Sequence, residues 1–212
     1  MTAQFGDMYT YKQKSYTVIA TSDAFPFRPK EYGLEPHCSC TACYRGYWCE
    51  YAIIDDQLVL QNLYLFNRDG AYPPINGVEV EPQEFIEHDC STSNGRNKKI
   101  KLPKLFGHRI YKNVNLPILY SGKILLGNGF LHEFYVHMGF QRGWAYQELI
   151  ELCFEEGILV ESYDLSHIAK EKRQSLEQQN VNLRYPDDTD IPQFVEDSFS
   201  LGYSEKAWWL KE

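Results

Sequence analysis

The feature that most constrains the fold is a series of short apolar runs separated by turn residues. Tyr47–Ile54 and Leu58–Phe66 are rich in aromatic and aliphatic residues, and the polar Asp55-Asp56-Gln57 between them is short enough for a hairpin turn. Met8–Thr21 shows the same alternation around Lys12-Gln13-Lys14. Because strands joined by such short turns pair antiparallel, these runs predict a β-rich fold.

The second half of the chain carries further strand candidates, separated by polar segments or by glycine-containing segments such as Gly127–Gly129, which we expect to be a turn. They are Ile118–Leu126, Phe130–His137, Gln147–Phe154 and Ile158–Asp164. The pattern then changes, because Ser166 can cap a helix that runs to about Asn180. A second helix signal covers Gln193–Phe199, and Trp208-Trp209-Leu210 is apolar enough to dock on the rest of the chain.

We therefore expect an α+β, β-rich fold. Its sheet would be an antiparallel meander, built as a sandwich or a partly open barrel, with a C-terminal helical appendage. The predicted division is a β-rich domain over residues 1–164 and a docked helical tail over residues 165–212. Residues 67–116 show the weakest pattern of apolar residues. We predict that they leave the main sheet and form short elements, with a short helix over Pro82–His88.

Composition limits the classes of partner. The chain has 212 residues, of which 43% are hydrophobic, so it can bury a sizeable core. Its 29 acidic and 21 basic residues give a formal charge of −8, which argues against general binding of nucleic acids or anionic membranes and suits a basic protein partner. No apolar run is long enough to span a bilayer and the first residues do not read as an export signal, so we expect a cytoplasmic protein with reduced thiols.

Four of the six cysteines lie within twelve residues, at Cys38, Cys40, Cys43 and Cys49. Four thiolates could hold a structural zinc ion. The alternative is a Cys-rich turn packed beside aromatic residues, since a free cysteine behaves as a small apolar side chain. The spacing C-x-C-x2-C-x5-C is not that of paired zinc knuckles, which favours the turn and leaves zinc as a possible cofactor.

The segment that ends this cluster resembles a known motif. Thr41–Tyr47 reads TACYRGY, and it is similar to the TACWRGY opening of a family of small uncharacterised bacterial proteins. Asp56–Leu60 follows it as the family's DGRLYL segment follows its opening. Tyr120–Ile124 and Tyr135–Phe140 are similar to the segments YSGxL and YVHMGY of that family.

The resemblance covers about residues 36–66 and 117–160 and leaves the helical tail outside. In the family pattern only the cysteine matching Cys43 is usual, so a shared zinc site is not implied. The family brings no assigned activity, and the resemblance therefore supplies motifs rather than a function.

Five residues are candidates for a binding site: Arg45, Tyr47, Tyr120, Glu133 and His137. The Arg45 guanidinium could grip a carboxylate or phosphate, or it could stack on neighbouring aromatic rings such as Tyr47. We also hypothesise that it locks the two halves of the sheet together beside Tyr120, with Glu50 or Glu133 as its acceptor. His137 could act as an acid and base because its ordinary pKa lies near neutrality.

Two functions follow from these candidates. The first is an acidic protein-binding module, such as an immunity-type or other neutralising partner of a basic protein, for which aromatic residues would supply interface anchors. The second is a small-molecule enzyme of the hydrolase kind that uses Arg45, Glu133 and His137. The sequence contains no phosphate-binding loop, nucleophile elbow or metalloprotease helix that would favour an enzyme.

Overall fold

The computed structural model describes residues 2–68, 70–91, 97–178 and 198–210. Most of its strands form one nine-stranded sheet in the order β11-β10-β9-β2-β1-β3-β4-β7, with β8 also pairing with β4. The strands of this sheet are β1 Met8–Tyr11, β2 Lys14–Thr21, β3 Tyr47–Ile54, β4 Gln57–Leu65, β7 Arg109–Tyr111, β8 Leu116–Pro117, β9 Gly122–Phe130, β10 Tyr146–Glu155 and β11 Ile158–Asp164.

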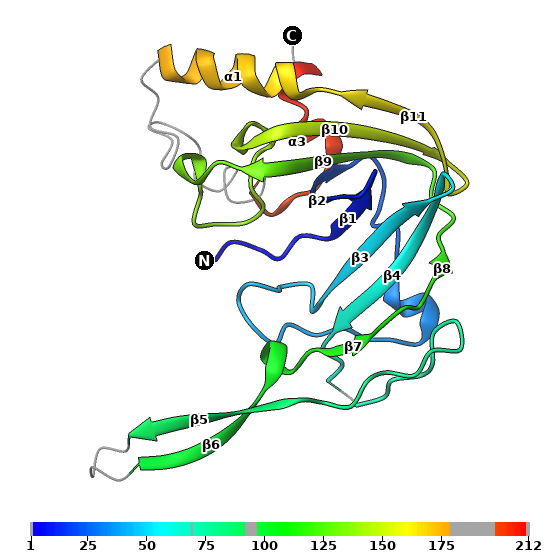
Figure 1. Ribbon diagram of the computed structural model, residues 1–212, viewed down its shortest axis with the longest axis vertical. Coiled ribbons are helices and arrows are strands. Elements are labelled where there is room, and N and C mark those ends of the chain that lie inside the picture. Colours follow the sequence, from blue (N-terminus) through cyan, green and yellow to red (C-terminus); the bar gives the residue numbers. More distant parts are fainter. Residues whose placement is uncertain (1, 69, 92–96, 179–197, 211–212) are drawn as a thin grey trace.

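The sheet curls until its two sides meet (Figure 1). β11 pairs with β4 at Ile158 and Gln57, and the amide of Leu159 donates to the carbonyl of Asp56 at 2.7 Å. The predicted β-rich α+β fold is confirmed, and of its two forms the structure has the partly open barrel. Because the curled sheet encloses its inner face, the buried apolar side chains of its strands meet in one main core.

The order of the strands departs from a simple meander where β2 pairs with β9 and where β1 pairs with β3, and the second of these pairs also differs in direction. β1 and β3 pair parallel, with Tyr9 opposite Tyr51, while the other strand pairs of this sheet are antiparallel. Parallel neighbours need a crossover connection. Here it consists of β2 and the proline-rich segment 22–46, which contains the short helix η1 (Pro29–Tyr32).

The helical tail docks on the outside of the sheet. α1 (Ser166–Gln178) follows β11, and its Arg173 donates hydrogen bonds to the carbonyls of Trp144 and Tyr146 at 2.9 and 2.7 Å. Ala169 of α1 lies in a second buried cluster, which also contains Tyr203 of the short helix α3 (Tyr203–Lys206). None of the helices in the described ranges is long and apolar enough to cross a membrane.

The predicted tail helices are confirmed only in part. α1 begins at Ser166 as expected, whereas most of the second signal, Gln193–Phe199, lies outside the described residues. The last described residues form the short helix η5 (Trp208–Leu210). The ring of Trp209 packs edge-on against Tyr203 with 6.3 Å between centroids, and the side chain of Trp208 lies outside the described part.

Three local predictions were wrong. Pro82–His88 is not a helix, because β5 (Phe85–Ser91) begins there and pairs antiparallel with β6 (Asn97–Pro103) as a separate two-stranded arm. Phe130–His137 is not a strand, since it turns through the short helix η3 (His132–Phe134). The predicted turn at Gly127–Gly129 is instead the continuation of β9, where Gly127 lies under the ring of Tyr146 and leaves no room for a side chain.

A β-bulge explains the burial along β4. Strict alternation would place Leu60 and Leu63 on opposite faces, yet both are fully buried. The register shifts opposite Glu50 and Tyr51, so Gln61 is the extra residue and the inward positions change parity after it.

The turn before β3 requires glycine. Gly46 has φ +78°, and a Cβ there would lie 2.5 Å from the carbonyl oxygen of His37. Gly77 has φ +75° with open space around it, so a substitution there measures the cost of the left-handed backbone without the cost of a close contact. We expect Gly77→Ala to cost roughly 1 to 2 kcal/mol from its left-handed backbone alone. Gly46→Ala should cost clearly more in urea unfolding, and equal losses would show that the contact with His37 is unimportant.

Candidate functional site

The centre of the candidate site is a buried ion pair between Arg45 and Asp7. The guanidinium binds both carboxylate oxygens of Asp7, with 3.1 Å from Nη1 to Oδ2, and its Nε donates to the carbonyl of Tyr47 at 2.8 Å. The exposed fractions of the two side chains are only 16% for Arg45 and 2% for Asp7. Burial alone would lower the pKa of Arg45, but the Asp7 carboxylate more than offsets this and holds that pKa above its ordinary value.

This ion pair joins the entrances of the two parallel strands. Asp7 directly precedes β1, Arg45 lies two residues before β3, and the backbone amide of Cys49 in β3 donates to Asp7 Oδ1 at 2.7 Å. One carboxylate therefore holds a side chain and a backbone group of the neighbouring chain segment.

Further hydrogen bonds extend the connection toward the amino terminus. The amide of Phe5 donates to the carbonyl of Ala42 at 2.8 Å, and Gln4 bonds both the carbonyl of Thr41 and the amide of Tyr44. The TACYRGY segment is thus paired with residues 2–7, which had shown no recognisable motif.

The structural hypothesis for Arg45 needs two corrections. Its acceptor is Asp7, not Glu50 or Glu133, because Glu50 accepts from Asn62 and Tyr64 on the outside of the sheet. The rings that cover the guanidinium are Phe25 and Tyr47, each with its centroid 4.6 Å from Cζ.

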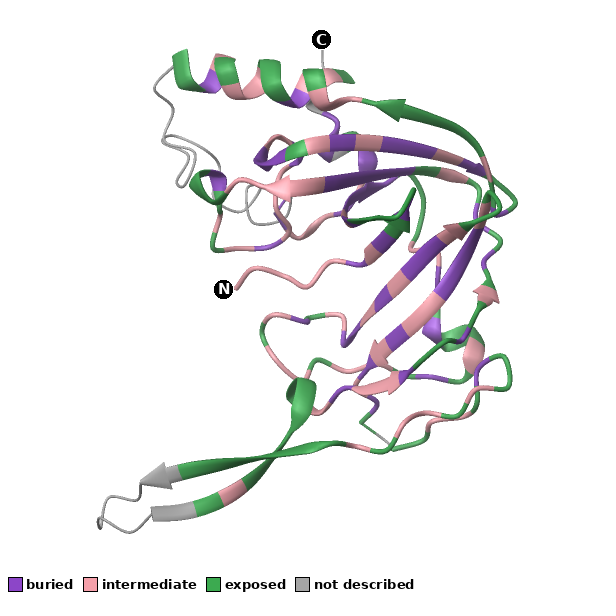
Figure 2. Cartoon of the chain, viewed as in Figure 1, coloured by how far each residue is buried: buried purple, intermediate pink, exposed green. Residues whose placement is uncertain are grey.

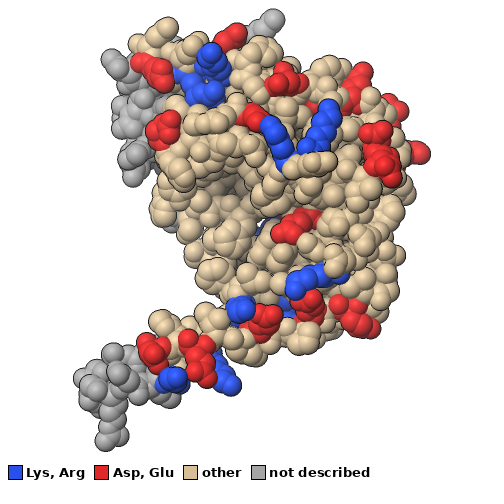
Figure 3. Space-filling model, in the orientation of Figure 1, with Lys and Arg blue, Asp and Glu red and all other residues tan. Residues whose placement is uncertain are grey.

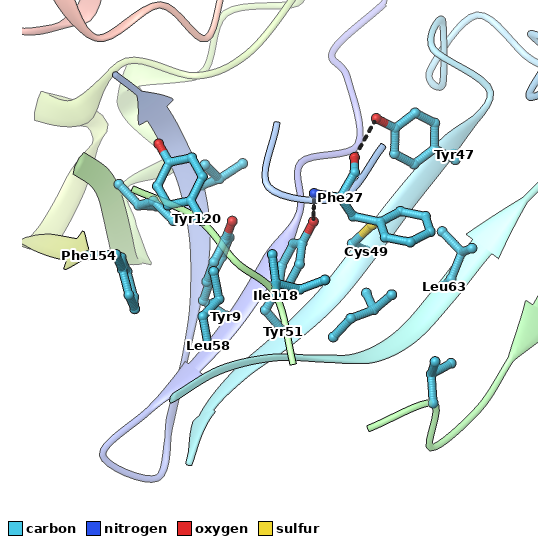
Figure 4. Close-up of a cluster of buried hydrophobic side chains, with 14 of the residues drawn as sticks. Tyr9, Phe27, Tyr47, Cys49, Tyr51, Leu58, Leu63, Ile118, Tyr120 and Phe154 are labelled. Atoms are coloured by element: carbon cyan, nitrogen blue, oxygen red, sulfur yellow. Dashed lines mark hydrogen bonds between the residues drawn. The ribbon is translucent and has the colours of Figure 1, made fainter. Parts of the chain in front are cut away.

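The five predicted binding residues lie in two places. Tyr47 and Tyr120 are both in the main core, where Figure 4 shows Tyr120 on the side of Phe154 and Tyr47 beside Phe27. Tyr120 makes its contacts there with Phe154 and the carbonyl of Lys123, so it does not enclose Arg45.

Glu133 and His137 are exposed and lie in or after η3. His137 Nδ1 lies 3.0 Å from the hydroxyl of Tyr135, and no hydrogen bond or ion pair among the described residues joins Arg45 to either of them. The constellation of the enzyme hypothesis is therefore not assembled around Arg45.

The cysteine cluster does not have the form of a zinc site. Cys49 lies fully buried in the main core and Cys43 is 2% exposed, whereas Cys38 is exposed. Burial raises the pKa of Cys43 to about 11 and that of Cys49 well above its ordinary value, which opposes the thiolate form that zinc binds. Across residues 2–68, 70–91, 97–178 and 198–210, no three Cys, His, Asp or Glu side chains are placed to hold a metal ion.

A pocket opens beside Arg45. Its volume is about 450 Å³, and apolar side chains from the crossover segment, including Phe25, Phe27 and Pro29, form its walls. Tyr51 accepts from the amide of Phe27 at 3.2 Å, and the hydroxyl of Tyr47 donates to the carbonyl of Phe27 at 3.4 Å (Figure 4). The wall of the pocket is therefore fixed to the core of the barrel.

A second exposed feature is the β5–β6 arm, which projects from the barrel (Figure 1) and whose described side chains are exposed except for Ile100 (Figure 2). We call its exposed large apolar residues, together with those at its base, the arm surface. These residues are Phe85, Ile86, Leu102, Leu105 and Phe106, with exposed fractions between 38% and 61%. The sequence did not single out this surface, because its apolar residues lie in two short groups, 85–86 and 102–106, that only the pairing of β5 with β6 brings together.

Comparison of the chain with protein-family models, with curated proteins and with solved structures finds no match. The resemblance to the bacterial family stays a prediction that rests on the quoted motifs. The arm surface and the Arg45 pocket are therefore the features from which a function can be inferred.

A double-mutant cycle tests the ion pair. We expect Arg45→Met to cost about 3 to 5 kcal/mol in urea unfolding, because it leaves the Asp7 carboxylate buried without a partner. Asp7→Asn keeps an acceptor for Cys49 but removes the charge. The double variant should lose much less than the sum of the two single losses.

The exposed ion pair between Lys99 and Glu87 provides the control for that cycle, since its side chains are 71% and 59% exposed. Lys99→Met should cost less than about 1 kcal/mol. Additive losses at Arg45 and Asp7 would contradict direct coupling between them.

Alkylation distinguishes the two interpretations of the cysteine cluster. In the folded protein at pH 8 we expect iodoacetamide to modify Cys38 and to leave Cys43 and Cys49 unmodified, as measured by mass spectrometry of peptides. The denatured protein, in which all cysteines react, serves as the control. Protection of Cys38 that a chelator removes, with one zinc per chain by elemental analysis, would instead support the zinc site.

Proposed function

We propose that the protein is an acidic protein-binding module and that the arm surface is where it binds its partner. The observation that carries the proposal is the exposure of large apolar side chains on a projecting element, with Phe85 57% and Phe106 61% exposed. Large apolar side chains that are exposed together on one element are typical of protein interaction sites.

The arm itself supports this proposal. Within the part of the chain that the structure describes, β5 and β6 pair only with each other, and an isolated two-stranded hairpin is at best marginally stable in water. One of its faces carries Ile86 opposite Leu102, and the other carries Phe85 together with charged pairs such as Lys99 with Glu87. Figure 3 shows acidic and basic side chains close together on the arm where it leaves the body. A partner that held the arm at its base would contact the apolar side chains of both faces.

The base of the arm carries strained backbone. In η2 (Lys104–Gly107), Leu105 and Phe106 have φ of 51° and 56°, a left-handed conformation that bulky residues rarely adopt. This conformation holds both side chains exposed, and Phe106 borders a hollow of about 370 Å³ that is also lined by Phe5 and Trp48. Strain that keeps apolar side chains outside is expected where those side chains have a binding role.

The formal charge of −8 suits a basic partner, because complementary charge speeds association and disfavours acidic partners. Neutralisation of a harmful basic protein is one form that this function could take. A cytoplasmic site of action belongs to the same proposal, since the five cysteines whose pairing the structure describes are free thiols.

Single substitutions on the arm surface test the proposal. Phe85→Ser and Phe106→Ser should each abolish recovery of a partner by the tagged protein from its native host. Each should change the free energy of unfolding in urea by no more than about 0.5 kcal/mol, as is usual for surface positions. The matched control is Leu119→Ser, because Leu119 is 83% exposed but lies outside the arm surface. A partner retained by both arm variants, or no partner recovered by the wild type, would contradict the proposal.

A further inference from the structure

We propose that the pocket beside Arg45 is a binding site for a small organic anion, a carboxylate or phosphate carried on an apolar or aromatic body. The site shares no residue with the arm surface and does not depend on the protein-binding function. Its volume of about 450 Å³ falls in the range of small-molecule sites.

The hydrogen bonds of Arg45 leave a donor for such an anion. A guanidinium has five N–H groups, and three of those on Arg45 are used, one by the carbonyl of Tyr47 and two by Asp7. The hydroxyl of Tyr47 also interacts with the Arg45 side chain and can take one of the other two, which leaves one N–H group for a ligand. Because Arg45 lines the pocket and most of its side chain is buried, an oxyanion in the pocket can accept from this group with charge assistance.

The guanidinium is fixed before any ligand arrives. Asp7 holds its end, and the rings of Phe25 and Tyr47 each lie 4.6 Å from Cζ. A side chain already held in place loses little conformational freedom on binding, so it favours a small ligand. The apolar walls around it suit the body of the ligand rather than a bare inorganic ion.

The rim of the pocket adds positive charge. Arg28 and Lys30 are exposed lining residues, and Glu31, the acidic lining residue, lies 3.7 Å from Arg28 as a long ion pair. Asp7 neutralises Arg45 from outside the lining, so the pocket and the groups behind it carry a net charge of one positive unit. This charge opposes the acidic balance of the whole chain and favours an anion at this place.

Phenylacetate and its neutral analogue 2-phenylethanol test the site directly. Titrated into the ¹⁵N-labelled full chain, phenylacetate should produce saturable NMR shifts at the amides of Phe25 and Tyr47 and at Nε of Arg45. It should bind at least about tenfold tighter than 2-phenylethanol, as one charge-assisted contact predicts. Phenyl phosphate is the second anion, and the tighter of the two identifies the preferred head group.

Arg45 itself is a poor test position because its loss would destabilise the fold as well as remove the donor. Ala24 is exposed and lines the pocket, so Ala24→Trp should fill it and abolish binding without changing the urea midpoint. Lys30→Gln should weaken phenylacetate binding severalfold, while the matched charge change Lys170→Gln on α1 should have no effect. Equal binding of phenylacetate and 2-phenylethanol, binding unaffected by Ala24→Trp, or no saturable shift with either anion would overturn the proposal.

Discussion

The structure depends on one buried carboxylate. Asp7 is almost completely removed from water, and Arg45 and the amide of Cys49 are its partners. A buried charge is tolerated only when it is paired and hydrogen-bonded. Asp7 therefore has to lie next to Arg45, and Arg45 next to Asp7. This mutual requirement holds β1 and β3 side by side where they pair parallel. The antiparallel hairpins on either side need no such device, because a short turn already sets their register.

The same interaction prepares the pocket. Asp7 and two aromatic rings hold the guanidinium in one orientation, and two hydrogen bonds fix Phe27 of the pocket wall to tyrosines of the core. A rigid charged group at the edge of a rigid apolar wall is a binding element, whereas the same arginine on a mobile loop would be a solvated surface charge. The arm surface is the opposite case, since its strands pair with no other described strand and its apolar residues face water. The two features therefore suit different ligands, a small anion at the pocket and a protein at the arm.

Much of the fold could be predicted from local pattern alone. The hairpins β1–β2, β3–β4 and β10–β11 and the start of α1 at Ser166 follow from alternation, turn residues and a cap. The parallel pairing of β1 with β3 could not be predicted, because periodicity shows which residues are strands but not which strands are neighbours. The glycines in β9 were read as a turn, since their actual role, to make room for Tyr146, exists only in three dimensions.

Only part of the candidate site could be predicted, because local pattern does not show which distant residues meet in the fold. Arg45 and Tyr47 stood out by their motif, and the structure places them together at the pocket. Asp7 was missed because a single acidic residue in a short segment matches no motif. A buried arginine needs a carboxylate partner, but the sequence does not show which acidic residue supplies it. Glu133 and His137 stood out as ionisable residues near an expected strand end, and that strand does not exist.

Hydrogen exchange at the amide of Cys49 tests the central claim most directly, because this N–H donates to Asp7 Oδ1 at 2.7 Å. If the carboxylate holds β1 and β3 together, this amide in the wild type exchanges only through global unfolding. In Asp7→Ala its protection should fall much further than that of Leu125 and Leu152, which lie in the β9–β10 part of the sheet. Rapid exchange of Cys49 in the wild type, or an equal loss of protection at all three amides in the variant, would contradict the account.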